Sequence, residues 1–181
     1  MRFIIIILFF IGSINCSAQK YTPVDPGSKV HFIIKNFGIG TGGDFNGLKG
    51  EINFDTIHPT SSIFNVSVAV KTIDTDNNLR DNDLRSKDYF DEPTFPEIKI
   101  ISTRIDKTNK TQTGYYFFTG NLVIKGISKP VSFPFLVERS GDGFLFTGEF
   151  TINRLDFGVG EKSMVLANKV IVSLKVFAKK M

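Results

Sequence analysis

The chain has 181 residues, 22 Lys and Arg against 18 Asp and Glu, and a formal net charge of +4. Such a small charge, interspersed along the chain rather than gathered in blocks, argues against nucleic-acid binding. One cysteine and two distant histidines do not provide a disulfide, a His-rich zinc site or a Cys–His pair, so we expect no metal and no thiol chemistry. The 19 phenylalanines, with no tryptophan, are more large rings than an ordinary core of this size needs.

The N-terminus predicts export. Arg2 precedes an apolar run at residues 3–14, which is too short to span a bilayer as a helix, and small residues end at Ala18. We therefore predict a signal peptide over residues 1–18, cleaved after Ala18, and a protein that is periplasmic or secreted. In the alternative interpretation, a lipoprotein signal leaves Cys16 acylated. Residues 19–181 are expected to form a single domain.

The mature chain alternates between apolar and polar residues with a period of two, which is typical of half-buried strands. After a polar lead-in at residues 19–26, we predict strands at 29–35, 45–54, 63–70, 97–105, 115–125, 131–138, 144–153 and 169–179. A loop is expected at 38–43, and a shift of parity predicts a β-bulge near Ile101. Eight strands joined mostly by short turns indicate an all-β, eight-stranded antiparallel barrel, although the pattern alone also allows a sandwich.

One segment breaks this alternation. Asn77 or Asn78 can cap a helix, and a helix cannot continue through Pro93 and Pro96. We predict one short helix at about 77–87 and an aromatic elbow at 89–96. Together they are expected to form a lid near the mouth of the barrel.

Several motifs resemble those of one family. They are Leu84 with Tyr89-Phe90-Asp91 and Phe95-Pro96, the turn Gly-Ile-Ser-Lys-Pro at 126–130, and Asn-Arg-Leu-Asp-Phe-Gly at 153–158. In these the chain resembles the YceI-like family of secreted, lipocalin-like, polyisoprenoid-binding proteins. The resemblance implies an extended eight-stranded barrel with a long prenyl or acyl chain inside, often in a homodimer.

A hydrophobic interior and lid are the first candidate site. Parity and the lid motifs select Phe32, Phe45, Leu84, Phe90, Phe95, Phe118, Leu122, Phe133, Phe135, Phe150 and Ile152. Parity does not distinguish a packed interior from a hollow one, and the resemblance favours a hollow one. Apart from the isoprenoid or lipid ligand, no cofactor is expected.

Arg154 is the polar candidate, because it continues the inward parity of Phe150 and Ile152. It can bind a phosphate or a quinone head group through its planar fork, or form a salt bridge to a lid carboxylate such as Asp83 or Asp88. The lid also carries a cluster of acids at positions 81, 83, 88, 91 and 92. We interpret these as solvated charge rather than as a calcium site or a glycosidase pair.

The sequence thus predicts a carrier without catalytic residues. It would sequester a long-chain isoprenoid or lipid, of polyprenyl, isoprenoid quinone or fatty-acyl type, in the cell envelope. One alternative is an enzyme that acts on a lipid or sugar through the lid carboxylates. The other is a structural or interaction barrel without a ligand.

Overall fold

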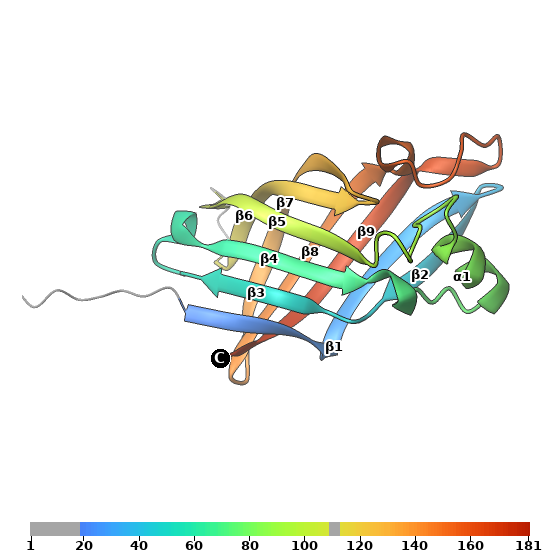
Figure 1. Ribbon diagram of the computed structural model, residues 1–181. Coiled ribbons are helices and arrows are strands. Elements are labelled where there is room, and N and C mark those ends of the chain that lie inside the picture. The colour runs from blue at the N-terminus through green and yellow to red at the C-terminus, as the bar shows by residue number, and fades with distance from the viewer. Residues whose placement is uncertain (1–18, 109–112) are drawn as a thin grey trace, which may run out of the picture.

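The computed structural model describes residues 19–108 and 113–181, so the predicted signal peptide and Cys16 lie outside the described residues. Within that part the chain forms nine strands, one α-helix and three short 3₁₀ helices (Figure 1). The strands are β1 Gln19–Asn36, β2 Ile39–Phe45, β3 Lys49–Phe54, β4 Ile63–Ala69, β5 Glu97–Lys107, β6 Tyr115–Ile124, β7 Ile127–Ser140, β8 Gly143–Asn153 and β9 Leu166–Lys180. The helices are η1 Pro59–Ser61, η2 Val70–Thr72, α1 Asn78–Arg85 and η3 Arg154–Phe157.

Eight of the strands close into an antiparallel barrel. The order runs β1-β3-β4-β5-β6-β7-β8-β9, and β9 pairs back onto β1 over most of its length. Closure removes the free edges that an open sheet would expose. The predicted eight-stranded antiparallel barrel is therefore confirmed, with β2 as one extra strand that pairs with β1 outside the ring.

The prediction of a loop at residues 38–43 was wrong, as was the single strand over 45–54. Residues 39–45 form β2, and residues 46–48 separate it from β3. The glycines of β2 leave room for rings on β1: a Cβ on Gly43 would lie 2.7 Å from Cζ of Phe32. Here glycine marks the close approach of a neighbouring side chain in a strand rather than the absence of a strand.

The polar lead-in at residues 19–26 was also mispredicted, because it is the first part of β1. Its residues pair with β3 through Tyr21 and Ile52, and with β9 through Pro23 and Ala178. Tyr21 and Pro23 are buried, but proline does not count as apolar in a period-two pattern. The alternation was therefore invisible in this stretch.

The β-bulge predicted near Ile101 is confirmed. The pairing of β5 with β6 shifts register between Ser102 and Arg104. One extra residue there lets Ile98 and Ile100 share the inward face with the fully buried Ile105, although their parities differ.

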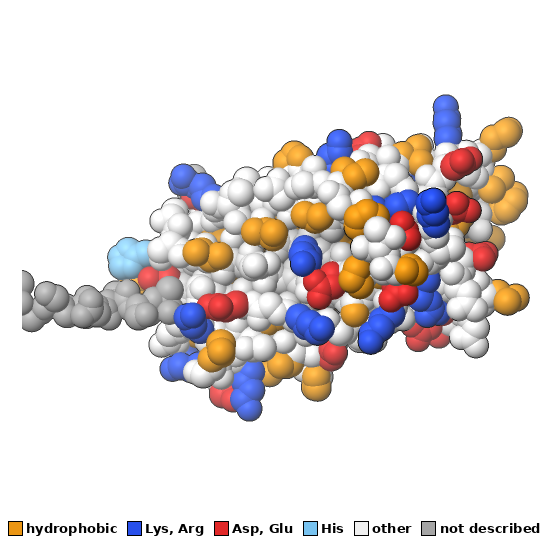
Figure 2. Space-filling view, viewed as in Figure 1, with side chains coloured by type: hydrophobic (Ala, Val, Ile, Leu, Met, Phe, Trp, Pro, Cys, Tyr) orange, Lys and Arg blue, Asp and Glu red, His pale blue; other side chains and the backbone are white. Residues whose placement is uncertain are grey.

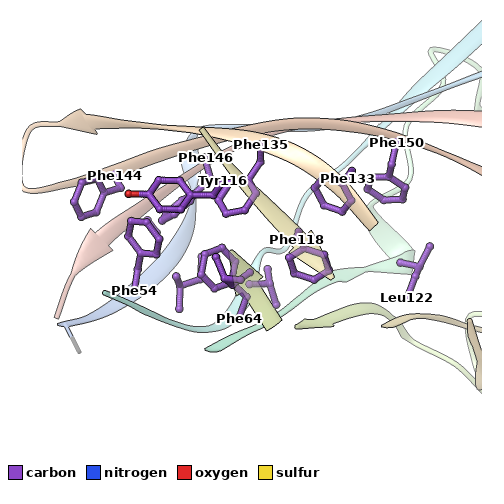
Figure 3. Close-up of a cluster of buried hydrophobic side chains, with 14 of the residues drawn as sticks. Phe54, Phe64, Tyr116, Phe118, Leu122, Phe133, Phe135, Phe144, Phe146 and Phe150 are labelled. Carbon is purple, nitrogen blue, oxygen red and sulfur yellow. The ribbon is translucent and has the colours of Figure 1, made fainter. Parts of the chain in front are cut away.

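Aromatic rings fill the end of the barrel that holds the β7–β8 turn (Figure 3). The ring of Phe54 contacts four others, with centroid separations of 5.1 Å to Tyr116, 5.6 Å to Phe144, 5.5 Å to Phe146 and 6.0 Å to Phe64. All four of these pairs are edge-to-face, the arrangement that the ring quadrupoles favour. This end of the barrel is a packed core.

The opposite end carries α1, which lies within the predicted range of 77–87 (Figure 1). The side chain of Asn77 caps the helix by accepting a hydrogen bond from the Arg80 amide at 3.1 Å. Asp81 is not the solvated charge that we predicted. It is only 4% exposed, and its carboxylate accepts hydrogen bonds from the amide and the hydroxyl of Thr75, which anchors α1 to the chain before it.

Candidate functional site

The interior is hollow between the aromatic core and α1. A cavity of about 260 Å³ lies at the α1 end, and a second of about 120 Å³ lies deeper in the barrel. The two cavities are adjacent, because six residues line both: Val30, Val68, Ile98, Leu122, Phe150 and Val172. A single water needs only about 10–15 Å³ of such space, so the larger cavity can hold part of a long chain.

Most of the predicted interior residues line this space. The larger cavity is lined by Phe32, Phe45, Asp83, Leu84, Phe90, Leu122, Phe150, Ile152 and Arg154. The smaller one is lined by Phe118, Leu122, Phe133, Phe135 and Phe150. Phe133 stacks on Phe150 at 4.6 Å between ring centroids, and the smaller cavity also reaches Phe64 and Phe146 of the aromatic core.

Phe95 is placed elsewhere. It lines neither cavity, and its half-buried ring lies beside the turn between β6 and β7, where a Cβ on Gly126 would be 2.9 Å from it. The elbow bends back after Phe90, since Asp91 adopts a left-handed φ of 51° and its amide donates to the Ser86 carbonyl at 2.8 Å. Phe95 is thereby carried away from the barrel mouth.

The lid packs onto the cavity through Phe90 and Leu84. The ring of Phe90 meets that of Phe45 edge-to-face at 5.7 Å, and the Phe90 amide donates to the Leu84 carbonyl at 3.0 Å. Lys125 ties the lid to the loop after β8, because its ammonium donates at 3.0 Å to the carbonyls of Lys87 and Gly158. These contacts hold an apolar wall over one side of the cavity.

Arg154 lies in η3 and is 3% exposed. Its guanidinium donates to the carbonyl oxygens of Ala167 at 3.0 Å, Val159 at 2.8 Å and Glu161 at 2.7 Å, and to the side-chain oxygen of Asn168 at 3.4 Å. Arg154 therefore gathers the loop between β8 and β9 around itself, while one of its five N–H groups has no acceptor among the described residues.

The salt bridge that we considered for Arg154 does not form. Among the salt bridges between described residues, none involves Arg154, Asp83 or Asp88. Burial lowers the pKa of Arg154 from its ordinary value, an effect partly offset by the nearby Tyr89. The ordinary pKa of a guanidinium is so high that the group stays protonated at neutral pH. Arg154 therefore places a positive charge on the cavity wall, and no described carboxylate lies within salt-bridge distance of it.

Several lining residues were not among the predicted site residues. The set common to both cavities includes Val30, Val68 and Val172, which share the inward parity of their strands. The alternation signals their direction, but the search for large rings passed over them. Arg80 also lines the cavity, with its guanidinium bound to Thr75, and no pattern in the sequence sets it apart from the other charges of α1.

A model of the family described as YceI-like domain matches residues 21–178. The sequence is 28% identical to a UPF0312 protein of Pectobacterium carotovorum over 155 residues, covering 82% of this chain and 79% of the relative. It is 37% identical to one of Photorhabdus laumondii over 89 residues, which span 49% of this chain and 44% of that protein.

Solved structures share the fold. BcnA of Burkholderia cenocepacia superposes with a TM-score of 0.79 at 26% identity, covering 86% of this chain and 99% of that one. A polyisoprenoid binding domain from Saccharophagus degradans superposes with a TM-score of 0.69 at 12% identity, covering 91% and 99%. In the part of this chain that the structure describes, no helix has the length and apolar character needed to cross a bilayer.

Proposed function

Because the chain belongs to the YceI-like domain family, we propose that it binds one long-chain isoprenoid or lipid in its barrel and carries or sequesters it in the cell envelope. It is a binding protein rather than an enzyme. The observation that supports this most directly is the apolar interior of the barrel, which holds two adjacent cavities.

The lining is adequate for affinity without any charged contact. Each buried methylene contributes about 0.8 kcal/mol, so ten of them contribute about 8 kcal/mol. That is the free energy of micromolar binding before the cost of ordering the chain is subtracted. A prenyl, quinone-tail or acyl chain of ten or more carbons is the ligand class that matches such a wall.

The polar end of the ligand is proposed to lie at Arg154. Its charge lines the larger cavity, has no carboxylate partner among the described residues, and keeps one N–H available. A phosphate or a quinone carbonyl placed there would receive a charge-assisted hydrogen bond. The apolar chain would then extend inward past Leu122 to the stacked pair of Phe133 and Phe150.

The proposal includes export and leaves the assembly state to measurement. Residues 1–18 have the composition of a secretory signal, and a homodimer is implied by the family resemblance. An enzyme acting through lid carboxylates is less well supported, because Asp81 is engaged with Thr75 and Asp83 is the one carboxylate among the described residues that line the larger cavity, so no pair forms there.

Native mass spectrometry of the protein purified after expression of its full sequence tests the function. We expect a reproducible one-to-one mass increment that extracts into solvent as a prenyl or acyl species, on a polypeptide that begins at Gln19. A bare polypeptide mass, without uptake after incubation with quinones and prenyl phosphates, would reject the carrier function. The same spectrum reports whether the protein is a dimer.

Phe90→Ala is expected to reduce lipid retention more than it reduces stability. The ring walls the larger cavity but is only half-buried and contacts Phe45 alone among the aromatic pairs, so its loss opens the mouth without hollowing the packed core. Retention is measured as bound lipid per protein after gel filtration, and stability by thermal melting. Phe95→Ala, in the same elbow but outside the lining, is the control; equal losses of retention in both variants would contradict the proposed lid.

Arg154→Gln is expected to reduce the preference for an anionic ligand over a neutral one. We predict that affinity for geranylgeranyl diphosphate falls at least tenfold relative to geranylgeraniol, because only the diphosphate gains from the cation. The two affinities are measured by displacement of a fluorescent probe or by calorimetry. Their ratio removes the effect on binding of any general loss of stability caused by freeing three carbonyls. An unchanged ratio would assign Arg154 to loop structure alone.

A further inference from the structure

Exposed apolar side chains gather at one end of the molecule. Phe37 is 75% exposed and Ile39 72% exposed at the β1–β2 turn, while Met164 is fully exposed and Val165 40% exposed before β9. The two segments are neighbours, since the Phe37 amide donates to the Val165 carbonyl at 2.9 Å. We call these four side chains the apolar rim, and Figure 2 shows hydrophobic side chains projecting from this end of the molecule.

The apolar rim adjoins the mouth of the larger cavity. Asn36, which lines the cavity, pairs directly with Ile39 on β2 and with Leu166 on β9. Thr41 and Leu166 line the cavity too. The rim therefore continues the lining outward into solvent, at the end of the barrel opposite the packed aromatic core (Figures 1 and 3).

The backbone at Phe37 is unfavourable for a phenylalanine. Phe37 and Gly38 form a two-residue hairpin turn with φ of 49° and 79°, the type in which asparagine followed by glycine is preferred. Lys125 and Gly126 form a similar turn between β6 and β7, with φ of 50° and 72°. There the side chain of Lys125 makes two hydrogen bonds within the protein, whereas the ring of Phe37 projects into solvent. Neither the turn nor burial favours a phenylalanine at this position, so we look for its role in a contact outside the chain.

The geometry favours a lipid surface over a second protein. The four side chains sit on convex tips and together offer roughly 500 Å², given the 150–250 Å² of a single aromatic side chain. A stable protein interface needs about 800 Å² from each partner.

Two lysines, Lys35 and Lys162, flank the tips, and neither joins a salt bridge between described residues. In segments 34–41 and 161–166, Glu161 is the one carboxylate. Apolar tips flanked by lysines match the interface of a bilayer with anionic headgroups.

We infer that the apolar rim docks on the surface of an anionic lipid bilayer, with the mouth of the cavity facing the membrane. Phe37, Ile39 and Met164 enter the interfacial region while the two lysines meet the headgroups. A chain in the cavity can then pass between barrel and bilayer without crossing water. That last step rests on the proposed function, but docking itself does not.

Vesicle flotation tests the docking. The full sequence is expressed with Cys16→Ser, so that no acyl anchor contributes, and the purified protein is floated with vesicles of phosphatidylcholine containing one quarter phosphatidylglycerol. We expect Phe37→Asn with Met164→Ser to lower the partition coefficient at least tenfold. Ile57→Ser with Ile63→Ser, which removes two exposed side chains near the packed end of the barrel, is the matched control and should leave it unchanged.

Phe37→Asn also separates docking from folding, because asparagine suits the turn and the Tm is expected to stay the same or rise. Wild-type protein that does not float, or rim and control variants that float equally, would overturn the inference. So would a dimer, seen by light scattering, that only the rim substitutions dissociate, since the rim would then bind a second copy. Flotation does not require a cargo: a protein that takes up no quinone or prenyl phosphate on incubation but still docks would reject the proposed function and leave the inference standing.

Discussion

Val172→Phe is expected to abolish lipid retention while the Tm changes by no more than a few degrees. Val172 lies on β9 and lines both cavities, so a ring there takes up free volume where the two adjoin. Overpacking a filled core typically costs about 1–3 kcal/mol, but here the added atoms enter empty space. Bound lipid per protein, measured by extraction and mass spectrometry, should fall at least tenfold.

Ile171→Phe is the matched control for this variant. Ile171 is the next residue on β9, is 36% exposed and faces outward, so the same ring is added to the same strand without entering the barrel. We expect its retention to equal that of the wild type. If Val172→Phe keeps its lipid, the ligand does not occupy the interior, and the proposed carrier function is rejected.

Phe54→Ala is expected to have the opposite signature, a large loss of stability with little direct effect on binding. Phe54 is 2% exposed, contacts four other rings and lines neither cavity. Truncation of a buried phenylalanine costs about 3–5 kcal/mol. Thermal melting should therefore show a Tm lower by roughly 10 °C for a domain of this size.

Retention by Phe54→Ala, measured well below its Tm, should match that of the wild type. A selective loss of lipid in this variant would mean that the ligand reaches into the aromatic half of the barrel. Together with Val172→Phe, this variant separates the contribution of the packed end of the barrel to stability from the contribution of the cavities to lipid retention.

The local pattern of the sequence was enough for the class of fold and for the direction of most side chains. Alternation over 63–70 or 115–125 fixes a strand and its inward face, because successive side chains of a strand point to opposite sides. Asn77 caps the start of the helix for an equally local reason, whereas the helix ends at Arg85, well before the two prolines. The β-bulge near Ile101 was predictable because an extra residue changes parity within the strand itself.

Only the tertiary structure decided which inward residues meet and which leave a space between them. Phe54 and Phe144 are 90 residues apart in the chain yet touch, while Val30, Val68 and Val172 face one another across a cavity. Likewise the glycines of β2 fit a strand only because rings from β1 lie against them, and Arg154 finds backbone carbonyls that no spacing predicts. The face on which a side chain lies is a property of one strand. The volume left inside the barrel and the contacts between side chains depend instead on the register of strands around the closed barrel, which is set by contacts distant in sequence.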